Sequence, residues 1–226
     1  MSDHTLRAAR RARGWTQGDL ARRLGVSQTY VSLFESGARP VPPGVAKKLV
    51  AALSLPATAV PVTAHRSPLS ADAAVQALGS MGYPGFAHLG TRKAILNPAE
   101  LVLRVLASRT VEARVVEALP WVLLLHPELD WDWLVTAAKV GDLQNRLGFV
   151  VTLARTLAEQ RGQRAEARIL AHWEQVLTYS RLQREDAFAS DTMTASERRW
   201  LATHRSAEAA HWNLLSNITA EALTSA

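Results

Sequence analysis

A short stretch near the N-terminus carries side chains that could hydrogen-bond to the edges of DNA bases. Small polar residues and one leucine recur there at i, i+3, i+4 and i+7, the spacing of one helix face: Thr29, Ser32, Leu33 and Ser36. Val31 and Phe34 form an apolar inner face. A short helix that is anchored on one side and mostly small and polar on the other is suited to insertion into the major groove of DNA.

The residues before this helix predict how it is held. Leu20, Ala21 and Leu24 give an apolar stripe to a preceding helix. Gly25 supplies the backbone freedom that a sharp turn requires. Ser27 can cap the next helix by accepting a hydrogen bond from a backbone amide of its first turn. The stretch is therefore predicted to be two short helices joined by a tight turn.

Two further helices flank this pair in the predicted arrangement. Residues 5–13 form a first helix, and residues 44–53 form a fourth after a proline-rich loop that excludes helix. Gln17 starts the second helix, where its amide and the helix N-terminus can both attract a DNA phosphate. Lys47 and Lys48 point outward from the fourth helix and are further candidates for phosphate contacts.

The basic charge of the chain lies in the same region. Residues 1–66 contain ten lysine and arginine residues and three acidic residues, a net charge of +7, whereas the whole 226-residue chain has a net charge of +6. A positive surface that coincides with a helix-turn-helix is expected of a protein that binds the phosphate backbone. A basic surface that is merely solvated is the less favoured interpretation.

The first quarter of the chain resembles a known family. Residues 5–55 are similar to the XRE family of helix-turn-helix domains, the type found in lambdoid phage repressors and Cro proteins. The residues that carry the resemblance are Leu6, Arg10, Thr16, Gln17, Leu20, Ala21, Leu24, Gly25, Val26, Ser27, Val31, Glu35, Ser36, Gly37, Arg39, Pro40, Leu49 and Leu53. The resemblance implies a compact bundle of four or five helices that binds a double-stranded DNA operator as a homodimer on a two-fold-related site.

The resemblance also implies roles for individual residues. It places four of them at base-reading positions: Gln28, Thr29, Ser32 and Leu33. It implies phosphate contacts from Gln17 and from the loop that contains Arg39. It further implies a structural ion pair between Arg10 and Glu35, which would support the domain without contacting DNA.

Two residues at this surface have two open interpretations each. Leu33 replaces the polar residue that is common at its position, and it either contacts a thymine methyl group or rests on the sugar–phosphate edge. Tyr30 either donates a hydrogen bond to a phosphate or is a flanking surface aromatic. The sequence does not decide between these alternatives.

The composition of the whole chain excludes several classes of protein. Hydrophobic residues make up 48% of it, so a sizeable core can form, and the lack of cysteine excludes disulfides, thiolate metal sites and cysteine nucleophiles. No run approaches the ~18 apolar residues of a membrane span. The arginine-rich N-terminal segment lacks the apolar core of a signal peptide. We therefore expect a cytoplasmic protein with no membrane partner.

Beyond the helix-turn-helix, the sequence predicts a linker and a second, larger domain. Residues 56–70 contain three prolines among small residues and are typical of an extended linker. Residues 71–226 contain a series of amphipathic helical patterns with short connections, and the longest pattern runs from 163 to 184. The predicted fold class is all-α: a lambda-repressor-like helix-turn-helix bundle in residues 1–55 and a C-terminal α-helical bundle.

Six of the seven tryptophans lie in the second region. Most are expected to anchor a core or an interface. Trp131 and Trp133 are two residues apart and cannot share a helix face, so one of them is expected to meet a partner or a second subunit. The candidate partner or dimer interface consists of Trp131, Trp133, Trp173 and Trp212.

Polar residues of the second region form no recognisable catalytic or metal-binding pattern. The sequence contains no Ser-His-Asp arrangement, no paired catalytic carboxylates and no nucleotide motif, so no enzyme activity and no cofactor is expected. His204 and His211 share a helix face, but solvated or core histidines explain them better than a metal site. Asn145 and Arg146 interrupt a strongly apolar helix, where a polar network, an interface contact and surface exposure are all open.

The sequence therefore predicts a sequence-specific DNA-binding transcription regulator, in its simplest form a repressor. Two roles remain open for residues 71–226. In one, the protein is an autoregulating antitoxin that holds a toxin protein through its C-terminal helices. In the alternative, it senses a small ligand or peptide in an apolar pocket lined by tryptophans. A DNA-tethered enzyme is the least favoured role.

Overall fold

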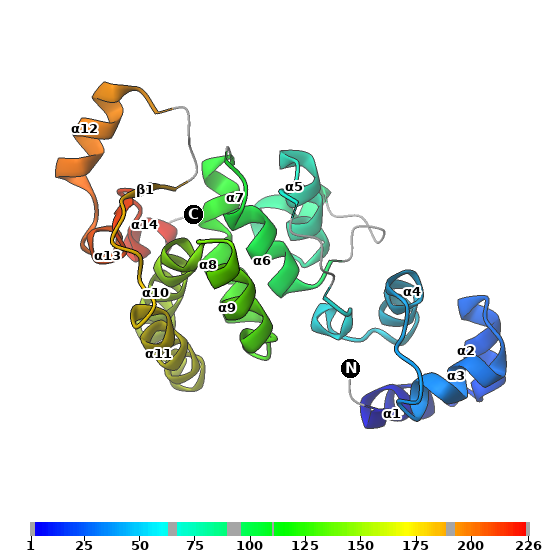
Figure 1. Cartoon of the computed structure of the whole chain (residues 1–226). Helices are drawn as coiled ribbons and strands as arrows, with labels where there is room; N and C mark the ends of the chain where they lie inside the picture. Colours follow the sequence, from blue (N-terminus) through cyan, green and yellow to red (C-terminus); the bar gives the residue numbers. More distant parts are fainter. Residues whose placement is uncertain (1–2, 63–66, 90–95, 110, 189–192, 225–226) are drawn as a thin grey trace. The chain divides into compact units, whose positions relative to one another are not determined.

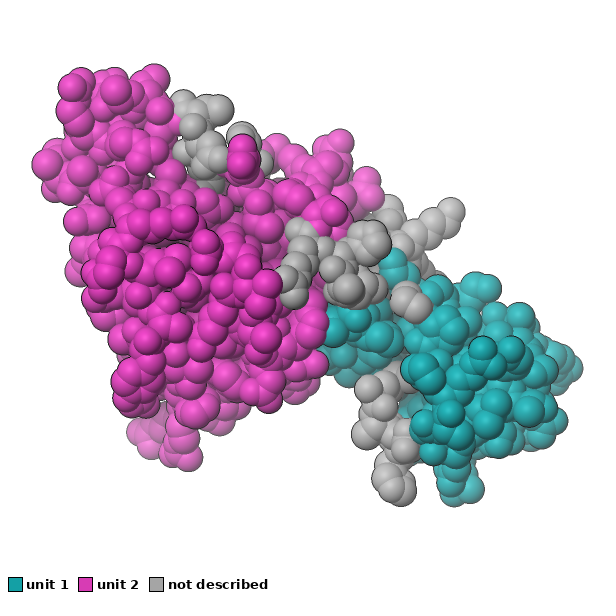
Figure 2. Space-filling view, viewed as in Figure 1, with its two compact units in different colours: residues 1–64, 95–97 teal, residues 65–94, 98–226 magenta. Residues whose placement is uncertain are grey.

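The computed structural model describes residues 3–62, 67–89, 96–109, 111–188 and 193–224, and these are predominantly helical. The chain divides into two compact units, residues 1–64 with 95–97 and residues 65–94 with 98–226, which Figure 2 shows in two colours. The predicted all-α fold class is confirmed. None of the described helices is both long and apolar enough to cross a membrane.

The first unit is a bundle of short helices: α1 (Asp3–Ala12), α2 (Gln17–Leu24), α3 (Gln28–Glu35), α4 (Pro43–Leu53) and the 3-10 helix η1 (Ala57–Ala59) (Figure 1). Its core consists of the apolar positions that the helical periodicity predicts: Leu6, Leu20, Ala21, Leu24, Val31, Phe34, Leu49 and Leu53. The period of the apolar residues therefore sets which face of each helix is buried.

Local signals fix the ends of α2 and the start of α3. The Thr16 hydroxyl accepts a hydrogen bond from the Asp19 amide at 3.1 Å, and the Asp19 carboxylate accepts one from the Thr16 amide at 2.9 Å. Gly25 ends α2 with a φ of 70°, a conformation that favours glycine. Ser27 then caps α3 by accepting a hydrogen bond from the Tyr30 amide at 3.3 Å. The predicted helix-turn-helix is confirmed.

The first unit continues beyond the expected boundary at residue 55. Val60 is only 3% exposed, although it lies in the stretch expected to be an extended linker. The Asn97 side-chain amide donates hydrogen bonds to the carbonyl oxygens of Thr58 and Val60, at 3.3 Å and 2.6 Å. Burial and these bonds hold 57–60 in place, which the proline content did not indicate. Residues 63–66 of the expected linker lie outside the described residues.

The second unit is a larger helical assembly (Figure 1). Its helices are α5 (Ala71–Ser80), η2 (Pro84–Leu89), α6 (Pro98–Leu106), α7 (Ala113–Glu117), α8 (Leu119–Leu125), α9 (Trp131–Val140), α10 (Gln144–Gln160), α11 (Arg164–Thr178), α12 (Ala195–His204), α13 (Ala207–His211) and α14 (Ala220–Thr224). Helix α10 is buried along most of its length, and α8, α9 and α11 pack against it. Two short parallel strands, β1 (Asp186–Ala187) and β2 (Leu214–Leu215), pair Asp186 with Leu214.

A buried polar network joins α10 to the chain that follows α11. The Arg146 guanidinium donates hydrogen bonds to both carboxylate oxygens of Asp186, at 2.6 Å and 2.9 Å, and to the Leu106 carbonyl oxygen at 2.8 Å. Asn145 donates to the Leu182 carbonyl oxygen at 2.9 Å and accepts from the Leu182 amide at 2.8 Å. Of the three alternatives left open for Asn145 and Arg146, the polar network is therefore the one found.

The same network explains why one predicted helix is too long. The pattern predicts a helix over 163–184, but α11 ends at Thr178. Leu182 pairs with Asn145 through its backbone amide and carbonyl, so those groups cannot serve a continuing helix. The amphipathic spacing continues through residues 179–184, but the pairing of Leu182 with Asn145 prevents these residues from extending the helix.

The tryptophans of the candidate interface lie at different depths. Trp212 is fully buried and donates a hydrogen bond to the Thr152 hydroxyl at 2.8 Å. Trp131 is 5% exposed and stacks on Trp173 with 5.6 Å between ring centroids. The predicted interface role is therefore wrong for Trp212 and Trp131, because both are core residues. Trp173 and Trp133 are half-buried, and their interface role stays a prediction.

Candidate nucleic-acid interface

Helix α3 (Figure 1) contains the four predicted base-reading residues, and helical periodicity places them on one side of it. Gln28, Thr29 and Ser32 are exposed, and Leu33 is half-buried. The exposed three carry an amide and two hydroxyl groups, which can donate and accept hydrogen bonds at base edges. The partial burial of Leu33 leaves both of its interpretations open.

The opposite side of α3 is anchored in the core of the first unit. Val31 is completely buried and Phe34 is 4% exposed, both in one cluster with Leu20 and Leu24 of α2. Packing of this kind fixes the direction in which a short helix presents its outer residues. Within its eight residues, α3 therefore combines an apolar face that is packed in the core with a polar face that is exposed.

The buried ion pair predicted between α1 and the end of α3 is confirmed. The Arg10 guanidinium donates to the two carboxylate oxygens of Glu35, at 2.5 Å and 2.9 Å, and Glu35 is only 1% exposed. Burial by itself raises the pKa of Glu35. The hydrogen bonds from Arg10 and Gln17 and the charge of Arg10 outweigh that effect, so the pKa of Glu35 lies below its ordinary value. Glu35 is therefore a charged structural centre.

Gln17 belongs to this same centre. Its side-chain amide donates a hydrogen bond to the Glu35 carboxylate at 3.0 Å. A glutamine amide has a second N–H and a carbonyl oxygen, so this bond orients the group without using all of it. The phosphate contact predicted for Gln17 stays a prediction. Its bond to Glu35 was not foreseen, because the two residues are 18 positions apart.

Arg39, in the loop after α3, lies against Tyr30 in the first turn of that helix. The Arg39 guanidinium carbon lies 4.6 Å from the centre of the Tyr30 ring, and both side chains are exposed. The Arg39 amide also donates to the Leu33 carbonyl oxygen at 3.2 Å, which ties the loop to the helix. A guanidinium that lies over an aromatic ring can still donate N–H groups to a phosphate. The two candidate phosphate contacts thus form one surface feature.

The two lysines of α4 differ. Lys47 is exposed. Lys48 donates a hydrogen bond to the Leu24 carbonyl oxygen at 3.3 Å, at the C-terminus of α2, where a cation interacts favourably with the helix dipole. Lys48 therefore has a structural partner, whereas Lys47 is the better candidate for a phosphate contact. Both contacts with DNA stay predictions.

One basic feature of the first unit was not singled out from the sequence. The guanidinium carbons of Arg23 and Arg13 lie 4.2 Å and 5.5 Å from the centre of the Trp15 ring. Trp15 is half-buried and so holds two cations at the surface beside α2. The sequence shows that this region is rich in arginine. It does not show that Arg13 and Arg23 lie over Trp15, because that depends on how α1 and α2 pack together. In the described part of the chain, no three His, Asp or Glu side chains are grouped to hold a metal ion.

Comparison with known proteins places this surface in a recognised kind of domain. Residues 4–61 match the family model of a helix-turn-helix domain. No curated protein and no solved structure matches the chain. The family match covers α1 to α4 and η1 and ends close to Val60, in agreement with the extent of the first unit. The chain therefore contains a helix-turn-helix DNA-binding domain of the kind found in transcription regulators.

Proposed function

We propose that the protein is a sequence-specific transcription regulator, acting as a repressor, that binds operator DNA through the outer side of α3. The observation that supports this most strongly is the exposure of Gln28, Thr29 and Ser32 on a helix whose inner side is locked into a core. Such a helix can enter a major groove without distorting the domain that carries it.

Phosphate contacts would fix the register of α3 on the duplex. Arg39 with Tyr30, Lys47 and the start of α2 at Gln17 are the groups that we assign to the DNA backbone. The N-terminus of α2 adds a partial positive charge at that point. These contacts supply affinity and orientation, while the side chains of α3 supply discrimination between base pairs.

We also propose that the protein binds DNA as a homodimer. Two identical recognition helices related by a two-fold axis read two half-sites about one helical turn apart, which multiplies the specificity of one short helix. A single helix with three exposed polar side chains reads too few base edges to select one operator from a genome.

The experiment that tests this function is selection of DNA from a random duplex library with the purified full-length chain. We expect enrichment of one sequence with two-fold-related half-sites, bound by two copies of the chain. A promoter that overlaps the enriched sequence should lose expression when the protein is present. A library that shows no enrichment over its starting composition would contradict the proposed function, and increased expression would contradict repression.

A second function is supported for the second unit, that of an effector-sensing domain. The observation in its favour is a cavity of about 470 Å³ that is bordered by apolar side chains and a few polar groups. Ligand pockets of about 300–1,000 Å³ with this kind of lining are typical of small-molecule sites. An antitoxin would instead hold a toxin protein, and co-purification of a stable protein partner with the chain would favour that role.

A further inference from the structure

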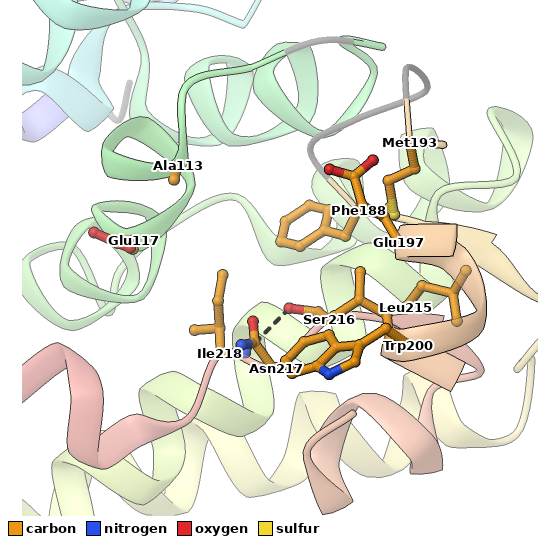
Figure 3. A pocket seen from close by; sticks show the side chains of 11 residues that line it. Ala113, Glu117, Phe188, Met193, Glu197, Trp200, Leu215, Ser216, Asn217 and Ile218 are labelled. Carbon is orange, nitrogen blue, oxygen red and sulfur yellow. Dashed lines mark hydrogen bonds between the residues drawn. The ribbon is translucent and has the colours of Figure 1, made fainter. Parts of the chain in front are cut away.

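The cavity of the second unit opens between α7, α12 and the segment that contains β2 (Figure 3). Its walls are mainly apolar and are formed by Phe188, Met193, Trp200, Leu201, Leu215 and Ile218. Phe188 and Leu215 are buried at its base, whereas Trp200 is 51% exposed at its rim. The ring of His204 is stacked on that of Trp200, with 4.5 Å between the ring centroids, and covers one face of it. The cavity thus offers an apolar base and one aromatic wall.

The charge of the cavity is negative. Two glutamates, Glu117 and Glu197, are among the described residues that line it, and none of those lining residues is an arginine, lysine or histidine. Hydrogen bonds from the Thr194 amide and hydroxyl hold the pKa of Glu197 below its ordinary value. Glu197 is therefore ionised at neutral pH. The nearby arginines Arg198 and Arg205 are directed to Glu185, at 3.6 Å and 3.9 Å.

Glu117 is the less satisfied of the two carboxylates. It is half-buried on α7, and no described residue forms a hydrogen bond or ion pair with its side chain. A half-buried carboxylate has lost part of its hydration, so a cation that entered the cavity would be attracted to it. Figure 3 shows Glu117 and Trp200 on opposite sides of the cavity, from α7 and α12.

We infer that this cavity binds an organic cation with a bulky apolar body. The positive centre would be attracted by Glu117, Glu197 and the face of Trp200, and the apolar body would pack on Phe188 and Leu215. A neutral apolar ligand would leave the two negative charges without a counter-ion, and an anion would be repelled by both. The inference deepens the effector-sensing function proposed above and rests on it.

Helix α12 is the element that the ligand would change most. None of its residues is buried, although Trp200 and Leu201 are apolar and border the cavity. A bound ligand would cover both side chains and add apolar contacts between α12 and the rest of the second unit. Slower amide hydrogen exchange in α12 is therefore an expected signature of binding.

The test uses two probe ions of nearly the same shape and opposite charge, tetraphenylphosphonium and tetraphenylborate. Each is titrated into the full-length chain in a calorimeter, without DNA. We expect the phosphonium ion to bind saturably, with at least tenfold higher affinity than the borate ion. Equal affinity for the two ions, tighter binding of borate, or no binding of either would overturn the inference.

Single substitutions then locate the binding. Glu117→Gln and Glu197→Gln should each weaken phosphonium binding about tenfold, equivalent to about 1.4 kcal/mol, and should not weaken borate binding. Glutamine can replace glutamate in the capping box of α12, so Glu197→Gln should still fold. Trp200→Ala should weaken the binding of both ions. Glu166→Gln on α11 is the matched control and should leave both affinities unchanged. Wild-type phosphonium affinity in both cavity glutamine variants would overturn the inference.

The outcome is separable from that of the DNA-binding function. The library selection is carried out on the same wild-type and variant preparations. Failure of phosphonium binding in a protein that still selects DNA refutes the cation site alone. Phosphonium binding with the predicted charge preference supports the cation site, whatever the selection experiment finds.

Discussion

The two units of this chain differ in the polar groups that they present at the surface, although the first unit also buries the pair formed by Arg10 and Glu35. In the first unit, Gln28, Thr29 and Ser32 face outward from a short helix, and residues 1–64 with 95–97 carry a net charge of +6. The second unit buries several polar side chains. Two of them, Arg146 and Asn145, donate hydrogen bonds to backbone carbonyl oxygens inside the unit. The second unit, residues 65–94 and 98–226, carries no net charge.

This difference separates two kinds of binding. A positive, polar and convex helix face suits a polyanion such as DNA, in which phosphates provide affinity and base edges provide specificity. A near-neutral unit with a negative apolar cavity does not suit a polyanion and suits a small cation instead. We therefore propose effector binding for the second unit beside the DNA binding of the first, and the two can be tested separately.

The largest effect is expected from the ion pair on which the first unit is built. Glu35→Ala removes the carboxylate that pairs with Arg10 and leaves a buried guanidinium without its counter-charge. We expect the free energy of unfolding of the first unit to fall by about 3–5 kcal/mol. This free energy of unfolding is measured by a denaturant titration in which the loss of DNA binding reports the unfolding of the first unit. Glu112→Ala, at an exposed glutamate, is the control, and an equally small effect of both changes would refute the structural role of Glu35.

The corresponding pair of the second unit should matter less. Asp186 binds Arg146, but its side chain is 24% exposed, and Arg146 keeps a hydrogen bond to the Leu106 carbonyl oxygen when Asp186 is removed. Asp186→Ala should therefore lower the free energy of unfolding by about 1.5–3 kcal/mol and leave DNA affinity unchanged. Denaturation followed by tryptophan fluorescence tests the first expectation and a DNA titration the second. A loss of DNA affinity in Asp186→Ala would contradict the claim that DNA binding depends on the first unit alone.

A smaller effect is expected from the phosphate-contacting surface. Arg39→Ala removes the guanidinium that lies on Tyr30, so it should weaken binding to all DNA sequences to a similar extent. The slope of log affinity against log salt concentration should decrease in magnitude by about 1. Arg168→Ala on α11 is a control at an exposed arginine of the second unit. Loss of affinity for the operator alone would show that Arg39 reads bases instead of a phosphate.

The smallest effect lies at acid pH and concerns the start of α2. Hydrogen bonds from the Thr16 hydroxyl and amide, and then from Arg22, lower the pKa of Asp19 from 3.8 to about 2. Because the pKa is lower in the folded state, the stabilisation by Asp19 is fully present above about pH 5 and is lost progressively as the pH falls through 3.8 to about 2. An NMR titration should give a pKa near 2 in the wild type. In Thr16→Ala the pKa of Asp19 should return towards 3.8, and an unchanged pKa would contradict the cap.

The parts of the fold that depend on near neighbours in the chain could be predicted from the sequence. The caps Thr16, Ser27, Asp130 and Thr194 act on amides three residues away, and the core of the first unit follows its apolar spacing. The outer residues of α3 could be assigned for the same reason, because helix periodicity alone decides which residues share a side.

The rest depends on contacts between residues that are far apart in the chain. The bond between Gln17 and Glu35 and the stack of Arg39 on Tyr30 arise only when separate elements are packed together. Trp212 could not be assigned correctly, since a tryptophan suits a core as well as an interface and its partner Thr152 lies 60 residues away. Long-range pairing of this kind leaves no local pattern in the sequence.

The central claim is that the outer side of α3 discriminates between DNA sequences. It is tested most directly by the ratio of affinities for the selected operator and for an unrelated duplex, at one salt concentration, in the variant Gln28→Ala with Thr29→Ala. We expect this ratio to fall at least tenfold while affinity for the unrelated duplex stays the same, because each lost base contact is worth about 1–3 kcal/mol of discrimination. The double variant Gln175→Ala with Thr178→Ala on α11 changes the same residue types and should keep the wild-type ratio. A wild-type ratio in the α3 variant would contradict the assignment of base reading to this helix.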